Sequence, residues 1–374
     1  MVNEKRVTDL FLKLAAFDSE SFSEKQIGQF VTSKLKDLGL EVYTDNTTDN
    51  EFLKAHPDSF PNIYAVLKGN NTADPILFSA HLDTVQPGKG KKPLITADGL
   101  ITSEGDTVLG ADDISGIVAI IEALTVIKEN NADHPDIEIL FTVSEEPFCE
   151  GSRFFNFGLI KSGIAYVLDL TGKIGTTAIS APSIISFTAD ITGKASHAGF
   201  APQEGISAIK IAAEAVNRIK TGKVDRMTTV NIGRIEGGTS NNIVPENVRL
   251  TGEIRSLNHS KALAKALEIE KIIRQYADKS GAQLDFTKVE HIKAYRIDKR
   301  ASVITGFKKA CKKTGIKPEF ITTFGGSDAN RLNEAGIVTV VNSCGMEKVH
   351  SSEEYTTVNE LVRSAELTFN LMTV

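Results

Sequence analysis

The sequence predicts a three-layer αβα domain into which a smaller α+β domain is inserted. At 374 residues, the chain exceeds the usual size of a single hydrophobic core. Strand-like apolar runs alternate with helical patterns in its first half and last quarter, which is typical of a sheet with parallel strands. Between them the rhythm changes to β-α-β-β-α-β. We therefore expect a larger α/β domain of residues 1–181 and 294–374, and an inserted domain of residues 182–293.

The first part of the chain begins with two helices, because apolar residues recur there at helical spacing. These helices are expected within residues 4–16 and 23–38. Asp98-Gly99 predicts the turn of a small hairpin, and the dense apolar run 114–127 predicts a buried helix. Strands are expected at residues 40–43, 63–67, 76–80, 137–143 and 164–168.

The inserted domain and the last part of the chain follow the same rules. Alternation at Ile185, Phe187, Ala189 and Ile191 predicts a half-exposed strand at the start of the inserted domain. Its other elements are expected as a helix at 206–219, strands at 228–235 and 248–257, a helix at 261–277 and a strand at 283–292. The α/β rhythm then resumes with a helix ending before Gly315, strands at 320–323 and 337–341, and a helix at 358–371.

Composition excludes several classes of function. A net charge of -6 and a pI near 5.8 provide no electrostatic footprint for nucleic acid. No apolar run is long enough to span a membrane, and no signal peptide is visible at the start. Cys149, Cys311 and Cys344 lack metal-type spacing and fit a reducing compartment. We expect a cytoplasmic protein without nucleic-acid or membrane partners.

Potential metal ligands stand at the ends of predicted strands. His81, the pair Glu145-Glu146 and Asp169 each follow such a strand, and Asp112 precedes the predicted buried helix. In open α/β sheets, binding sites form outside the carboxyl ends of the strands, so these side chains are expected to converge. Imidazole and carboxylate ligands without thiolates suit zinc or a similar divalent metal.

The same residues suggest how such a site could work. Two ions can share one carboxylate and activate a water. One member of the pair Glu145-Glu146 could bind metal while the other transfers protons. Asp83, two residues after His81, could accept the second ring N–H of that histidine.

Each of these residues also has a simpler interpretation. A histidine at a strand end is more often hydrogen-bonded in a core, an aspartate before a helix is more often an N-cap, and adjacent glutamates are often surface charge. Only their coincidence at one sheet edge favours a metal site. His197, in a turn of small residues, and His350, after the last core strand, remain candidates as further ligands or catalytic groups.

Five motifs spread over nearly the whole chain complete the pattern. They are His81-Leu82-Asp83-Thr84-Val85, Gly110-Ala111-Asp112-Asp113, Ser144-Glu145-Glu146, Asp169 and His350. Together they resemble the dizinc exopeptidase and amidohydrolase family that includes peptidase T, carboxypeptidase G and the aminoacylases. Gly-Ala-Asp-Asp, Gly-Lys-Ala-Ser-His-Ala-Gly and the short length are most similar to peptidase T-like members.

The resemblance assigns each matching residue a role. It implies that Asp112 bridges two zinc ions, for which Co²⁺ or Mn²⁺ could substitute. His81 and Asp169 would complete the first ion, and Glu146 and His350 the second. The resemblance further implies that Glu145 is the general base and acid, that Asp83 orients His81, and that the Asp112–Asp113 peptide bond is cis.

The inserted domain resembles the lid and dimerisation domain of the same family. His197 would reach the partner's active site in a homodimer and stabilise the oxyanion. Asn242 and Arg255 would hold the carbonyl or carboxylate of the substrate. Gly326, within Gly325-Gly326-Ser327, would belong to a substrate-binding loop.

The expected function is metal-dependent hydrolysis of amide bonds in short peptides, as in an aminotripeptidase. An N-acyl amino acid amidohydrolase or a carboxypeptidase-type exopeptidase would use the same metal site. A non-catalytic, metal-stabilised dimeric binding module is an alternative of another class. Magnesium-dependent phosphohydrolase chemistry would favour oxygen ligands, and the two histidines count against it.

Overall fold

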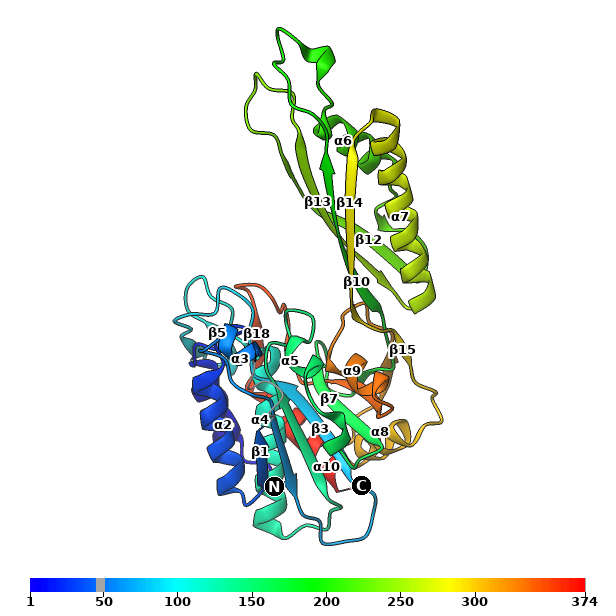
Figure 1. Cartoon of the computed structure of the whole chain (residues 1–374). Helices are drawn as coiled ribbons and strands as arrows, with labels where there is room; N and C mark the ends of the chain where they lie inside the picture. The colour runs from blue at the N-terminus through cyan, green and yellow to red at the C-terminus, as the bar shows by residue number, and fades with distance from the viewer. Residues whose placement is uncertain (45–50, 374) are drawn as a thin grey trace. The chain divides into compact units, whose positions relative to one another are not determined.

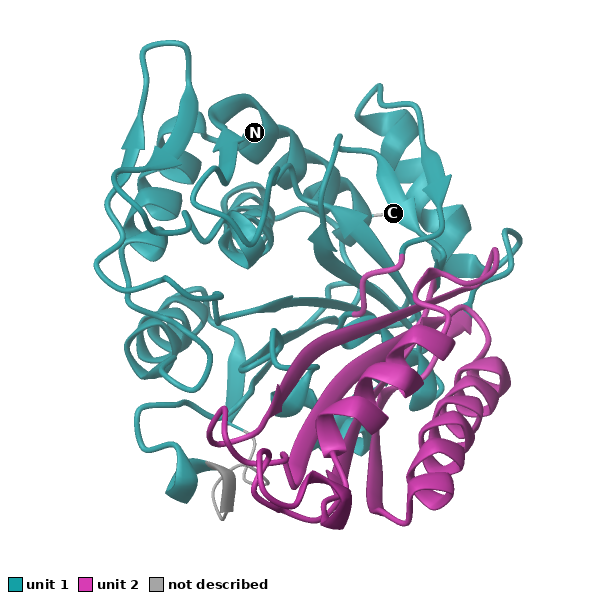
Figure 2. Ribbon diagram, turned by 90° about the horizontal axis from the view of Figure 1, so that it is seen from above, with its two compact units in different colours: residues 1–180, 296–323, 327–374 teal, residues 181–295, 324–326 magenta. Residues whose placement is uncertain are grey.

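The computed structural model describes residues 1–44 and 51–373. The chain divides into two compact units, coloured separately in Figure 2. Unit 1 consists of Met1–Ser180, Arg296–Thr323 and Ser327–Val374. Unit 2 consists of Ala181–Tyr295 and Phe324–Gly326. The chain therefore leaves the fold of unit 1, completes a second unit and returns.

Unit 1 is built on a mixed sheet of eight strands. In spatial order they are β1 (Glu41–Thr44), β2 (Ile63–Leu67), β6 (Ile137–Thr142), β3 (Ile76–His81), β7 (Ile164–Leu170), β17 (Val338–Ser343), β8 (Thr176–Ala178) and β16 (Glu319–Ile321). The central strands β6, β3, β7 and β17 run parallel to one another. The carboxyl ends of these four strands consequently meet at one edge of the sheet.

Helices cover both faces of this sheet. Every residue of β2, β3 and β6 is buried, as a strand covered on both faces requires. The helices of unit 1 are α1 (Glu4–Ala15), α2 (Lys25–Asp37), α3 (Glu51–Ala55), α4 (Ala111–Asn130), α5 (Glu150–Arg153), α8 (Ser302–Lys313), α9 (Asp328–Glu334) and α10 (Val358–Met372). This arrangement is the predicted three-layer α/β fold (Figure 1).

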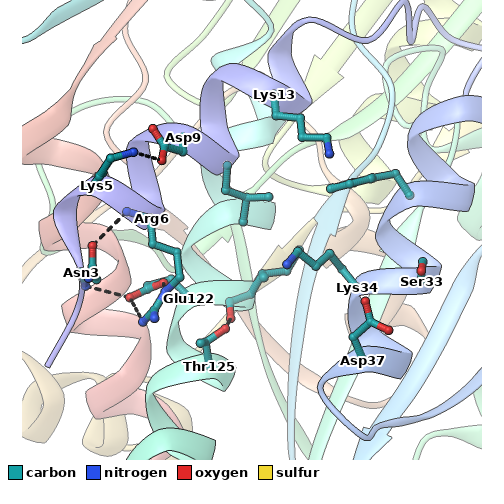
Figure 3. A pocket seen from close by; sticks show the side chains of 13 residues that line it. Asn3, Lys5, Arg6, Asp9, Lys13, Ser33, Lys34, Asp37, Glu122 and Thr125 are labelled. Carbon is teal, nitrogen blue, oxygen red and sulfur yellow. Dashed lines mark hydrogen bonds and ion pairs between the residues drawn. The ribbon is translucent and has the colours of Figure 1, made fainter.

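Helix α4 is the buried helix that the apolar run predicted. It packs against β3, β7 and α10, and nearly all of its residues up to Ile127 are buried. Gly116 permits this close approach, because a Cβ there would lie 2.4 Å from the carbonyl oxygen of Leu168 in β7. Helix α4 also contacts α1, where Arg6 binds the buried carboxylate of Glu122 of α4 through Nε and Nη2 (Figure 3).

The hairpin predicted around Asp98-Gly99 forms β4 (Pro93–Ile95) and β5 (Leu100–Ser103). A third strand, β18 (Tyr355–Thr357), pairs with β5. This small sheet therefore connects the first part of the chain to the segment just before α10.

Unit 2 is a five-stranded antiparallel sheet with two helices. Its strands lie in the order β11 (Gly222–Lys223), β12 (Thr228–Gly237), β13 (Asn247–Ser256), β10 (Ser183–Thr192) and β14 (Gln283–Ile292). Helices α6 (Ala208–Arg218) and α7 (His259–Ser280) pack together on one face of the sheet (Figures 1 and 2). Alternate residues of β10 enter the hydrophobic core between them. Apart from the two-residue β11, the order of elements is the predicted one.

The chain passes from one unit to the other within two short strands, β9 (Ser180–Ala181) and β15 (Tyr295–Arg296). Element bounds differ from the prediction by a few residues, and two differences concern the site. His81 is the last residue of β3, and Asp169 lies inside β7, so neither follows its strand. Within the described residues, no helix has the length and apolar character that crossing a bilayer requires.

The close packing of α4 on β7 predicts a stability difference between two glycine variants. Gly116→Ala should lower the free energy of unfolding by about 1–3 kcal/mol, because the new methyl group meets backbone that cannot move freely. Gly163→Ala is the matched control, since a Cβ there would meet nothing within 4 Å. Thermal unfolding of both purified variants tests this, and equal midpoints would contradict the packing described.

Candidate metal centre

The five predicted ligands come together in unit 1. His81 ends β3, Glu146 lies in the turn after β6, and Asp169 lies near the end of β7. Asp112 lies at the start of α4, and His350 lies in the turn after β17. Because β6, β3, β7 and β17 are neighbours with parallel directions, their carboxyl ends bring these side chains to one place.

The ligands form two groups that share Asp112. Ligand atoms of His81, Asp112 and Asp169 lie within 4.8 Å of one another, and so do those of Asp112, Glu146 and His350. Asp112 Oδ1 lies 3.1 Å from His81 Nε2, and Asp112 Oδ2 lies 3.2 Å from His350 Nε2. One carboxylate thus presents one oxygen to each group, as a bridging ligand does.

The remaining distances agree with two adjacent ion sites. His81 Nε2 lies 3.8 Å from Asp169 Oδ1, and His350 Nε2 lies 3.1 Å from Glu146 Oε2. The backbone at Asp112 is not helical, with φ -84° and ψ 101°, although it lies in the first turn of α4. The peptide bond between Asp112 and Asp113 is cis, as the resemblance implied.

The electrostatics of the cluster favour cations. Burial raises the pKa of Asp169 well above its usual value, and the charge on Asp112 raises it further. Hydrogen bonds to Asp112 and Glu146 raise the pKa of His350 to about 10. Glu146 Oε1 is buried and has no hydrogen-bond partner among the described residues. Buried carboxylates with an oxygen left unpaired fit divalent metal ions, which would offset their repulsion.

The ring of His81 is oriented for metal binding through Nε2. Nδ1 lies 2.9 Å from the backbone carbonyl oxygen of Asp83, which can only accept a hydrogen bond. Nδ1 must therefore carry a proton, and Nε2, 3.1 Å from Asp112 Oδ1, is the ring nitrogen available to a metal ion. The expected carboxylate of Asp83 is farther away, at 3.4 Å from Nδ1, so the orienting acceptor is chiefly the backbone of that residue.

The carboxylate of Asp83 instead holds the loop that carries the two glutamates. It accepts hydrogen bonds from the backbone N–H of Glu145 at 2.9 Å and of Glu146 at 3.2 Å. Ser21 Oγ donates a third at 2.7 Å. Since Asp83 lies two residues after His81, it links the segments after β3 and β6.

Glu145 belongs to neither ligand group and is buried beside the cluster. Burial raises its pKa well above the usual value, and the charges of Asp328 and Glu146 add to this effect. Cys149 Sγ donates a hydrogen bond to Glu145 Oε1 at 3.2 Å and so helps to orient this carboxyl group. A raised pKa makes the Glu145 carboxylate a stronger base, and it lies beside the candidate metal ligands, so it is suited to accept a proton.

Two of the predicted substrate-binding residues lie close together in unit 2. His197 is exposed, and its Nδ1 accepts hydrogen bonds from the backbone N–H of Gly199 and Phe200, both at 3.1 Å. The neutral ring therefore carries its proton on Nε2. Asn242 lies on the neighbouring segment, where its backbone oxygen accepts from Ala198 N at 2.9 Å.

The other two predicted substrate-binding residues, Arg255 and Gly326, make contacts within unit 2. Arg255 binds Glu253 through Nε and Nη2 at 2.6 and 3.0 Å, and Nη1 donates to the carbonyl oxygen of Phe324 at 2.9 Å. At Gly326 a Cβ would lie 2.2 Å from Ile292 Cδ1, so a larger residue there would require the Ile292 side chain to move. Sequence reasoning missed Glu253, although residues two apart on a strand share a face.

Two buried carboxylates that the sequence did not predict also support the cluster. Glu24 accepts hydrogen bonds from both the backbone N–H and the side chain of Ser144, next to Glu145. Glu354 accepts three backbone N–H groups around Asp112. Neither residue belongs to a recognisable motif, and no local pattern indicated that either would be buried.

Comparison with known proteins agrees with this geometry. The model for the peptidase dimerisation domain matches residues 179–281, which cover most of unit 2. The model for peptidase family M28 matches residues 62–218. An uncharacterized protein of Bacillus subtilis, YqjE, is 38% identical to this chain over 98% of its length and 97% of the relative.

Solved structures place the chain within a family. A tripeptidase from Staphylococcus aureus is 32% identical, with a TM-score of 0.94, over 100% of this chain and 98% of the other. The aminopeptidase PepT from Bacillus cereus is 37% identical, with a TM-score of 0.91, over the same shares. Similarity of this degree over the full length, together with two groups of metal ligands, shows that the chain is a peptidase T-like member of the M20 family of metallopeptidases.

Proposed function

We propose that this protein is a cytoplasmic dizinc aminopeptidase that removes the amino-terminal residue from short peptides, above all tripeptides. Its family makes it a metal-dependent hydrolase of peptide bonds. The single observation that carries the mechanism is the arrangement of Asp112, which offers one oxygen to each ligand group while Glu145 stays outside both. The tripeptidase and aminopeptidase relatives support the choice of substrate.

The donor set supports zinc as the metal. Each group combines one histidine nitrogen with carboxylate oxygens and contains no thiolate, and Co²⁺ or Mn²⁺ could replace zinc at such sites. His81 and Asp169 would hold one ion, Glu146 and His350 the other, and Asp112 both. Bound there, the ions would polarise the scissile carbonyl and increase the acidity of a water.

Glu145 would move the proton. In this assignment its carboxylate accepts a proton from the attacking water and delivers it to the nitrogen of the departing amine. Its position depends on Asp83, whose carboxylate binds the Glu145 N–H, and on the Cys149 thiol, which donates to Oε1. Burial favours this role, because it raises the pKa of Glu145 and so makes its carboxylate a stronger base.

Residues 182–293 would form a lid and dimerisation domain. We assign His197 as a donor to the developing oxyanion in the active site of the partner subunit, through the proton on Nε2. Asn242 would bind the substrate carbonyl, and the loop at Gly326 would border the substrate. Arg255 would bind the carboxylate of the peptide only after exchanging its contact with Glu253, which makes that pair a candidate control of specificity.

The alternatives have less support. The tripeptidase and the aminopeptidase named above are 32% and 37% identical to this chain, which does not favour an N-acyl amino acid amidohydrolase or a carboxypeptidase-type enzyme. A non-catalytic binding module would not require both a complete ligand set and Glu145. Location in the cytoplasm is supported by Cys149, Cys311 and Cys344, which are all free and buried.

Substrate preference and metal dependence can be tested together. The purified, zinc-loaded protein should hydrolyse trialanine faster than dialanine and leave N-acetylalanine intact, because a free amino terminus is recognised. Complete removal of metal by a chelator should abolish hydrolysis, and added Zn²⁺ should restore it. Activity that persists without metal, or a preference for N-acetylalanine, would contradict the proposal.

A mixing experiment tests the roles of Glu145 and His197. Glu145→Gln and His197→Ala should each reduce kcat by about 10²–10⁴-fold, through loss of proton transfer and of oxyanion stabilisation respectively. If His197 acts in the partner subunit, mixed dimers contain one intact site. Equal amounts of the two variants, exchanged to equilibrium, should therefore recover about a quarter of wild-type activity.

The Glu145→Gln variant should still bind two metal ions, which separates proton transfer from metal binding. The control mixture pairs wild-type protein with Glu150→Gln, a change in an exposed ion pair of α5 that should leave activity unchanged. No recovery in the first mixture, or full activity of a monomer, would rule out a role for His197 across the dimer.

A further inference from the structure

The start of α4 lacks a cap of its own. The first N–H groups of a helix have no partner within the helix, and a side chain at the N-cap usually supplies one. The N-cap of α4 is Gly110, which has no side chain and adopts the left-handed conformation. The shared ligand Asp112 follows two residues later, with non-helical backbone angles. The segment that carries the bridging carboxylate therefore needs its acceptors from elsewhere in the chain.

Glu354 supplies these acceptors. Its Oε2 accepts hydrogen bonds from the backbone N–H of Leu109 and of Gly110, both at 2.8 Å. Its Oε1 accepts from the N–H of Asp112 at 2.9 Å. The residue is only 2% exposed, so water cannot replace these contacts readily. One buried carboxylate thus caps a helix whose sequence lies more than 240 residues away.

Glu354 also belongs to the turn that carries His350. Its backbone N–H donates to the carbonyl oxygen of Ser351 at 3.1 Å and closes this turn. Directly after it, β18 pairs with β5, and Thr356 Oγ1 donates to the carbonyl oxygen of Gly345 at 2.8 Å. The turn is therefore anchored to the small sheet on one side and, through the Glu354 side chain, to the start of α4 on the other.

We propose that Glu354 is a positioning residue that fixes the Asp112 and His350 segments relative to each other and thereby sets the affinity of the metal centre. This inference rests on the proposed metal roles of Asp112 and His350. Glu354 would not bind metal itself, because both of its oxygens face backbone N–H groups.

A carboxylate is the side chain that this position requires. Ionised, it offers two oxygens that only accept, and three donors point at it. Glutamine at this site would retain one acceptor oxygen and place an NH₂ group opposite a backbone N–H. Aspartate would keep both oxygens but withdraw them by one methylene group. Each change should shift the segment of Asp112 while leaving all five ligands in the sequence.

Glu138 provides a matched control in the same unit. It is also 2% exposed, and its carboxylate accepts the backbone N–H groups of Lys161 and Ser162 and the hydroxyl of Tyr64. Its place in β6 is opposite Leu77, four residues before His81 in the paired strand. Glu138→Gln should therefore disturb a similar buried network without reaching the ligands.

The experiment measures metal affinity in the full-length protein. Wild type, Glu354→Gln, Glu354→Asp and Glu138→Gln are titrated with Zn²⁺ in competition with a chelator of known affinity, and their Co²⁺ forms are compared by visible absorption. Glu354→Gln should bind at least one of the two ions about 10–100-fold more weakly, with an altered Co²⁺ spectrum. Glu354→Asp should weaken binding in the same direction, and Glu138→Gln should match wild type in both measurements.

Two results would overturn the inference. One is wild-type affinity and an unchanged Co²⁺ spectrum in Glu354→Gln, or in Glu354→Asp if the glutamine variant does not fold. The other is an equal loss of affinity in Glu138→Gln, which would show a general effect of destabilisation. A wild-type protein that does not bind two ions would instead refute the proposed function, so the two failures are distinguishable.

Discussion

The mutual repulsion of buried carboxylates is the constraint on which the rest of this structure depends. Asp112, Asp169, Glu145 and Glu146 lie together at one edge of the sheet, beside the imidazole rings of His81 and His350. Burial makes each charge more costly than it would be in water. The raised pKa of Asp169 and of Glu145 is the direct consequence. Divalent cations would offset this cost, which is why the arrangement suits metal binding.

Holding such groups together requires a rigid frame of backbone donors. The parallel strands bring the segments of the candidate ligands to one edge, and hydrogen bonds to carboxylates outside the two ligand groups connect these segments further. Asp83 binds the N–H groups of Glu145 and Glu146, Glu24 binds Ser144 just before them, and Glu354 binds the segment of Asp112. Asp83, Glu24 and Glu354 thus surround the candidate metal ligands and orient the segments that carry them.

The structure brings the predicted ligands together because their positions follow from general rules of α/β sheets. His81, Asp112, Glu146 and Asp169 all lie where strands end or helices begin, and such positions converge whatever the details of packing. The order of elements in both units followed from apolar periodicity for the same reason. The strand bounds were less accurate, since His81 and Asp169 still belong to β3 and β7.

What the sequence could not predict depends on contacts between distant segments. Glu354 stands in Ser-Ser-Glu-Glu, which has the composition of an exposed loop, and only the folded chain brings it to the N-terminus of α4. The orientation of His81 by the carbonyl oxygen of Asp83 likewise leaves no trace in composition, because every residue has such an oxygen. The pairing of Glu253 with Arg255 could have been predicted from the sequence, since both lie on one face of β13.

Anomalous X-ray diffraction at the zinc edge, from crystals of the intact zinc-loaded protein, tests the central claim most directly. The account predicts two peaks in each chain, both next to the Asp112 carboxylate. One should lie beside His81 and Asp169, and the other beside Glu146 and His350. A single peak, or a peak among Glu145, Cys149 and Asp328 instead, would contradict it.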